Sequence, residues 1–195
     1  MRRVLGWMLA TLAVIGASSC AQHRAELVDC KNFVMSPSQY MEQFAGRPGQ
    51  ETQQELNFIC HADIYGRAQM IYAGMAQQRS ASPAVREFAA QSAAAQREMI
   101  QRLNQIAIQQ EGVTPPRGLD ASHLALRNQL AQLSGAAFDR AYLQSAVQDG
   151  QAAIALFRRA GSGMEPILGQ FASGALPGLQ QRASQAQGLL QQAGY

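Results

Sequence analysis

Residues 82–110 read SPAVREFAAQSAAAQREMIQRLNQIAIQQ, and this stretch decides the fold. Its inward positions recur at intervals of three and four, which is the period of one face of an α-helix. They are Val85, Phe88, Ser92, Gln96, Met99, Leu103 and Ile106. Ser82 is a typical N-cap residue and Pro83 a favourable first helical residue. The stretch therefore predicts a long amphipathic helix that begins at Pro83.

The same period continues before and after this helix. It predicts further helices over 51–78, 121–133, 136–159 and 164–192, with Asp120 as the cap of the short one. Gly161-Ser162-Gly163 is expected to separate the last two helices, and Pro177 to kink or split the last. No stretch alternates with period two over a useful length. We therefore predict an all-α fold, a four-helix bundle with short additional helices.

The N-terminus has the order of a secretory signal. Arg2 and Arg3 precede an apolar run over 4–16, and small residues lead to Cys20. The run is shorter than the roughly 20 residues that span a bilayer. A Cys in this place resembles a bacterial lipoprotein processing site, which makes Cys20 the acylated first residue of a periplasmic protein attached to the outer membrane. The alternative is ordinary cleavage after Ala21, which discards Cys20.

Export defines the expected segments and the use of the cysteines. Residues 1–20 form the signal, 21–49 an irregular segment with one short helix, and 50–195 the helical bundle. In an oxidising compartment Cys30 and Cys60 are expected to form one disulfide. On the chain-entropy model it contributes about 3–4 kcal/mol to stability. A redox pair would need the C-x-x-C spacing, which these two residues lack.

The charge balance excludes one class of partner. The chain has 16 basic and 13 acidic residues, and its basic residues form no patch with interleaved aromatic residues. Nucleic acid is therefore not an expected partner. The expected association is with a membrane, through the lipid on Cys20.

Four short patterns occur in a fixed order along the helices. They are Phe58-x-x-x-Ala62 with Gly66, Ser82-x-x-Val85-x-x-Phe88-Ala89, Ser134-Gly135-x-x-Phe138-Asp139-x-x-Tyr142, and Ala175-Leu176-Pro177-x-Leu179. In this order they resemble the ferritin-like family of exported bacterial proteins of unknown function, often described as outer-membrane proteins. The resemblance covers about residues 55–192. It implies a ferritin-like four-helix bundle.

The resemblance also implies where a metal site would lie. The family's carboxylate and histidine positions fall here on Gln69, Gln96, Gly150 and Arg182. Glutamine offers a neutral carbonyl, glycine offers no side chain, and arginine carries a permanent positive charge. We therefore expect neither a metal nor another cofactor, and no catalytic residue. The predicted function is a non-catalytic envelope protein with a structural, stress-related or binding role.

Arg182 has two possible places in such a bundle. It can enter the core and form an ion pair with Asp149, with Gln69 and Gln96 hydrogen-bonded nearby, so that a guanidinium replaces the metal cation. Alternatively, Pro177 rotates the last turns and the arginine extends to water.

Two further functions stay open from the sequence. One is a metal-dependent ferritin-like enzyme or metal-binding protein with the atypical ligands Asp63, Glu98 and Asp149. The other is binding of a small apolar ligand in space left by Gly66, Gly74 and Gly150. The histidines carry no recognisable catalytic pattern. His23 and His61 are expected at the surface, and His123, in the first turn of the short helix, is expected to cap that helix or to be solvated.

Overall fold

A computed structural model of the chain describes residues 51–109, 115, 118–164 and 166–193, without the side chains of residues 51–53. The predicted signal over 1–20, the segment 21–49, and the residues Cys20, His23 and Cys30 lie outside the described part. Their roles stay predictions.

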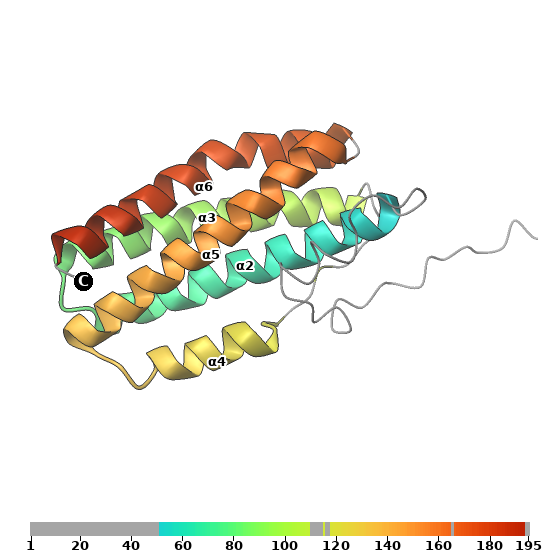
Figure 1. Ribbon diagram of the computed structural model, residues 1–195. Helices are drawn as coiled ribbons and strands as arrows, with labels where there is room; N and C mark the ends of the chain where they lie inside the picture. The colour runs from blue at the N-terminus through green and yellow to red at the C-terminus, as the bar shows by residue number, and fades with distance from the viewer. Residues whose placement is uncertain (1–50, 110–114, 116–117, 165, 194–195) are drawn as a thin grey trace, which may run out of the picture.

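The described residues form a helical bundle without strands. Four long helices pack side by side: α2 (Glu51–Arg79), α3 (Pro83–Gln109), α5 (Gly135–Gly163) and α6 (Pro166–Gln192). The short α4 (Ala121–Leu130) lies along the outside, beside α2 (Figure 1). α3 and α5 run in the same direction, so the connection that contains α4 travels along the bundle (Figure 1). The predicted all-α bundle is confirmed.

The predicted helix starts are confirmed by their caps. The Ser82 hydroxyl accepts a hydrogen bond from the Val85 N–H at 3.4 Å, at the start of α3. The Asp120 carboxylate accepts one from the His123 N–H at 2.8 Å, at the start of α4. α5 begins at Gly135, whose φ of 60° lies in the left-handed region that glycine enters without a steric penalty.

The last two helices differ from the prediction. α5 continues through Gly161 to Gly163. A Cβ at Gly161 would lie 2.5 Å from the Ser173 hydroxyl, so this glycine lets α5 and α6 approach closely rather than ending α5. Pro177 was expected to kink or split α6, and of these two outcomes the split does not occur, because α6 is one helix through Pro177. The proline removes one hydrogen-bond donor, but buried side chains on both sides of it, Phe171 and Leu179, hold the two halves against the same core.

The core consists of two apolar clusters, one towards each end of the bundle. One cluster is built around Phe58, Phe157 and Phe171. The other is built around Tyr72, Phe138 and Tyr142. Between them the four long helices carry polar side chains at inward positions. The apolar core is therefore interrupted near the middle of the bundle.

The glycines proposed to open space in the bundle do not do so. A Cβ at Gly66 would lie 2.7 Å from the Ile100 Cγ1 atom, and one at Gly150 would lie 3.2 Å from the Ala183 Cβ atom. Gly74 has open space around it, but it lies on an exposed face of α2. Gly66 and Gly150 therefore serve close helix packing, and they leave no space for the interior apolar ligand that the sequence left open. None of the described helices combines the length and the hydropathy needed to cross a membrane.

Candidate functional site

The central polar layer is the set of polar side chains between the two apolar clusters, and all four long helices contribute to it. It consists of Tyr65, Gln69, Gln96, Asp149 and Arg182. Gln69 and Gln96 are 4% and 1% exposed, Gly150 is buried beside them, and Arg182 is half-buried. The structure thus places all four positions where the resemblance implies metal ligands on the inner side of the bundle.

Two hydrogen bonds link the helices within this layer. The Gln69 Nε2 atom donates to the Asp149 Oδ2 atom at 2.9 Å, and the Gln96 Nε2 atom donates to the Tyr65 hydroxyl at 3.3 Å. Burial raises the pKa of Asp149, against the opposing charge of His123. Burial also raises the pKa of Tyr65 to about 12. Tyr65 therefore keeps its proton at neutral pH and can donate it in a second hydrogen bond.

The predicted ion pair between Asp149 and Arg182 is wrong. Among the described residues, no carboxylate lies within salt-bridge distance of the Arg182 guanidinium. Asp149 accepts from Gln69 instead. Arg182 folds back along α6, where its Nη1 atom lies 3.2 Å from the position that a Cβ at Gly178 would take. Its Nε atom is nevertheless buried, so the side chain does not simply extend to water.

The three carboxylates considered as atypical metal ligands do not come together. Asp63 is fully buried and bound by Arg67, one turn later on α2. Glu98 is exposed on the outer face of α3, and Asp149 is held by Gln69. Across the described part of the chain, no three His, Cys, Asp or Glu side chains are grouped so that they could hold a metal ion.

A second polar group lies where α2, α4 and α5 meet. The Asp120 Oδ1 atom is 2.8 Å from the His123 Nδ1 atom, and the Tyr72 hydroxyl donates to the His123 carbonyl at 2.9 Å. Burial lowers the pKa of His61, although the charge of Asp120 opposes the shift. His61 and His123 are half-buried, so neither is fully solvated. The docking of α4 against α2 covers them.

The charges in this second group are fixed by their contacts. Burial alone would raise the pKa of Asp120, but hydrogen bonds from the His123 side chain, its backbone N–H and Ser122 hold that pKa well below its usual value. Burial alone would lower the pKa of His123, but the hydrogen bond and charge of Asp120 raise it. The arrangement favours a protonated His123 next to an ionised Asp120.

The two histidines should give stability profiles of opposite sign. The pKa of His61 is lower in the folded state than in the unfolded state. Its contribution to the free energy of unfolding is therefore present above the unfolded-state pKa of about 6.5 and is lost as pH falls. The folded-state pKa of His123 is raised, so its contribution is present below that value and lost as pH rises. Relative to the parent, His61→Gln should lose less stability at lower pH, and His123→Gln should lose less at higher pH.

Urea unfolding of the parent and both variants from pH 5 to pH 8 measures the difference in free energy of unfolding between each variant and the parent. Each difference should change by at most about 1.4 kcal/mol per pH unit. Each variant is the matched control for the other because both histidines lie in one polar group. The assignment is that folded His123 is charged and folded His61 is neutral. It would be contradicted if the differences of the two variants from the parent changed in the same direction with pH.

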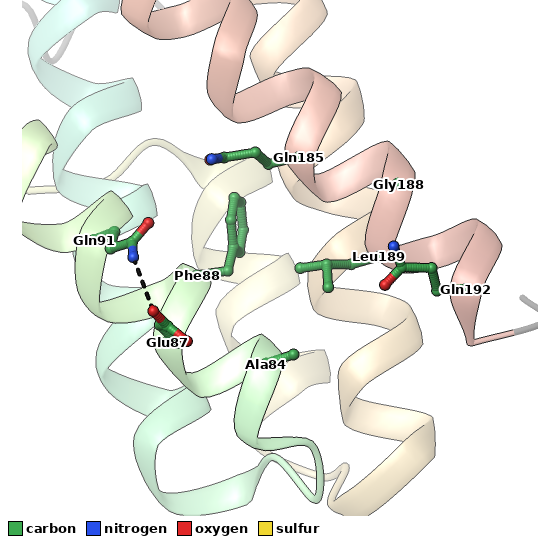
Figure 2. Close-up of a pocket in the computed structure, with 8 residues that line it drawn as sticks. All are labelled: Ala84, Glu87, Phe88, Gln91, Gln185, Gly188, Leu189 and Gln192. Carbon is green, nitrogen blue, oxygen red and sulfur yellow. Dashed lines mark hydrogen bonds between the residues drawn. The ribbon is translucent and has the colours of Figure 1, made fainter.

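A groove runs along the surface between α3 and α6, near the end of the bundle formed by the second apolar cluster. Figure 2 shows the Phe88 ring standing between the two helices, with Leu189 on α6 beside the same opening. The cavity volume is about 400 Å³. Its rim is polar, with Glu87, Gln91, Gln185 and Gln192, and the Gln91 amide donates to Glu87 at 3.2 Å (Figure 2).

A second groove, between α5 and α6, has different chemistry. Its volume is about 450 Å³. Four glutamines, a serine and an arginine line it: Gln151, Gln180, Gln187, Gln191, Ser184 and Arg158. Amide groups both donate and accept hydrogen bonds. The α5–α6 groove therefore offers several amide contacts and one cation, Arg158, beside the apolar side chains of Val147 and Ile154, whereas the α3–α6 groove has an aromatic base.

One participant of the central polar layer, Tyr65, was not predicted. It lies four residues before Gln69 on α2. This spacing keeps the tyrosine on the same helix face as the predicted position. The sequence therefore contained a signal, but it did not distinguish a tyrosine in the polar layer from one in the apolar core.

Comparison with known proteins gives a family and a fold. A family model described as "Domain of unknown function (DUF4142)" matches residues 41–189. The crystal structure of a DUF305 fragment from Deinococcus radiodurans is similar, with a TM-score of 0.64 and 19% sequence identity. The similarity covers 71% of this chain and 96% of that one. At this identity it concerns the fold alone. No curated protein gives a significant match.

Proposed function

This chain belongs to the DUF4142 family, a domain of unknown function, and from the chemistry of its bundle we propose that it is a non-catalytic protein of the cell envelope. Its role is structural, stress-related or binding, and it acts through its surface. Within the all-α bundle we propose the ferritin-like class that the sequence patterns resemble. Its support is that α3 and α5 run in the same direction (Figure 1), as do helices joined by a long crossover in that class.

The central polar layer is the observation that carries the proposal. A dinuclear metal site in a ferritin-like bundle needs carboxylates and imidazoles that converge from several helices. Here the inward amides of Gln69 and Gln96 bond to Asp149 and Tyr65, and α6 contributes the cation Arg182. A guanidinium at this position repels a metal cation. The layer has the chemistry of a structural contact between helices.

The two surface grooves support a binding role. The α3–α6 groove combines an aromatic base with a polar rim, which is the usual composition of a site for a partly apolar ligand or side chain. Gly188 lines both grooves, and a Cβ there would meet no atom within 4 Å. A partner can therefore approach this part of α6 closely.

Export and anchoring are supported by the sequence of residues 1–20. The order of arginines, apolar run and small residues before Cys20 favours lipidation and attachment to the outer membrane. The proposed disulfide joins Cys30 to Cys60, which is buried on α2. Non-reducing peptide mapping should recover residues 30 and 60 in one linked fragment. Recovery of both thiols free would contradict the disulfide.

The test is the metal content and membrane association of the full chain, expressed in a bacterial host with an outer membrane. Elemental mass spectrometry, after purification without a metal-affinity tag, should find iron, manganese and zinc far below one atom per chain. Cys20→Ala should abolish lipidation of the N-terminal peptide, whereas the neighbouring control Ser19→Ala should keep it. Stoichiometric metal would overturn the non-catalytic assignment, and membrane association independent of Cys20 would overturn the anchor.

A further inference from the structure

The groove between α3 and α6 carries a single charge. Glu87 is the one charged residue among the eight described residues that line it, and its side chain is exposed. The α5–α6 groove is the opposite case, since Arg158 is the one charged residue among its described lining residues. A carboxylate on the rim of a groove attracts cations and repels anions. The two grooves therefore favour ligands of opposite charge.

The charge of Glu87 is not neutralised by a basic side chain. Within the described part of the chain, Glu87 forms no ion pair. The adjacent Arg86 donates through its Nη1 atom to the Ser80 carbonyl at 2.7 Å, and it does not line the groove. Glu87 instead accepts from the neutral amide of Gln91, through its Oε1 atom, at 3.2 Å. The carboxylate therefore keeps its charge and can accept further hydrogen bonds from a ligand.

An apolar surface lies directly beside this carboxylate. Phe88 follows Glu87 in the chain, and its ring stands between α3 and α6, with the Leu189 side chain pointing towards it from α6 (Figure 2). The ring also packs against the Tyr142 ring, with centroids 6.1 Å apart, so the core fixes its position. A cation near the face of an aromatic ring is attracted by it. The groove thus combines a carboxylate, an aromatic ring and an aliphatic side chain around one opening.

We propose that the α3–α6 groove binds a small organic cation with an apolar chain, of the alkylammonium class. The chain lies against Phe88 and Leu189, and the ammonium group donates to the Glu87 carboxylate. The volume of about 400 Å³ is that of a small-molecule site. The inference deepens the binding role proposed above and rests on it. Its failure would leave the tests of metal content and of membrane anchoring unaffected.

The first test compares three probes of similar size that differ in charge: hexylammonium, hexanol and hexanoate. Each is titrated into the isotope-labelled full chain at neutral pH, and NMR follows the backbone amide resonances. Hexylammonium should shift those of Phe88 and Leu189, and it should bind about 3–10-fold more tightly than hexanol, because the ion pair and the aromatic ring both favour the cation. Hexanoate should bind most weakly. The resonances of Gln151 and Gln187, in the α5–α6 groove, should shift less with the cation.

The second test removes one contact at a time. Glu87→Gln keeps the size of the side chain and loses its charge, so hexylammonium and hexanol should then bind equally. Glu98→Gln, at an exposed glutamate on α3 outside the groove, should keep the preference of the parent. Leu189→Ala should weaken both probes by a similar factor, because it removes apolar surface. Equal affinities of the parent for the three probes, or no saturable shift at the groove residues, would overturn the proposal. A preference for hexylammonium that persists in Glu87→Gln would do the same.

Discussion

Replacing Phe157 by alanine is expected to lower the free energy of unfolding by about 3–5 kcal/mol. Phe157 is fully buried at the centre of the first apolar cluster. Its ring meets Phe58 edge-on, with centroids 5.1 Å apart and planes at 73°, and it meets Phe171 at 6.0 Å. Its removal leaves a cavity between α2, α5 and α6 and destroys two aromatic contacts. Urea unfolding followed by circular dichroism measures the loss.

Ile108→Ala is the matched control because it also shortens an apolar side chain. Ile108 is 58% exposed on α3, so its replacement should change the free energy of unfolding by no more than about 0.5 kcal/mol. A loss below about 1 kcal/mol for Phe157→Ala would mean that the three rings do not pack together as described. Equal losses for the two variants would contradict the division between the core and the surface of the bundle.

The helices and their buried faces were predictable because the signal is local. Spacings of three and four residues mark the inward face of a helix wherever it packs. Val85, Phe88, Met99 and Leu103 are all buried on α3 as that period requires. Caps are equally local, and Asp120 begins α4 where predicted. The long crossover between α3 and α5 carries no such signal, so the place of α4 was not predicted.

The central polar layer was predicted only in part because its contacts join different helices. Helical period showed that Gln69, Gln96, Gly150 and Arg182 face inward, but it gave neither their heights along the bundle nor their rotamers. Gln69 lies closer to Asp149 than Arg182 does, and it forms the bond that was assigned to the arginine. The partial burial of His61 was not predicted for the same reason, since Asp120 and His123, whose charges act on it, come from the start of α4, far along the chain. Tertiary packing decided both outcomes.

Replacing Arg67 by methionine is expected to lower the free energy of unfolding by about 2–3 kcal/mol at neutral pH. Asp63 is 0% exposed and is bound by both the Nε and Nη2 atoms of Arg67, the latter at 3.2 Å. Methionine removes the counter-ion and leaves the carboxylate buried. The expected loss is smaller than the roughly 3–5 kcal/mol of fully buried pairs, because Arg67 is 31% exposed and water screens its charge.

The pH dependence and a second substitution test the cause of this loss. Burial already raises the pKa of Asp63 against the opposing effect of Arg67, and removing Arg67 should raise it further. The contribution of a group with a raised folded-state pKa is present below its unfolded pKa and lost as pH rises, so the deficit of Arg67→Met should shrink as pH falls. Adding Asp63→Asn should recover most of the stability at neutral pH, because the buried carboxylate is then absent. A deficit that is independent of pH and of Asp63→Asn would assign the loss to packing of the Arg67 side chain against α2, and not to its charge.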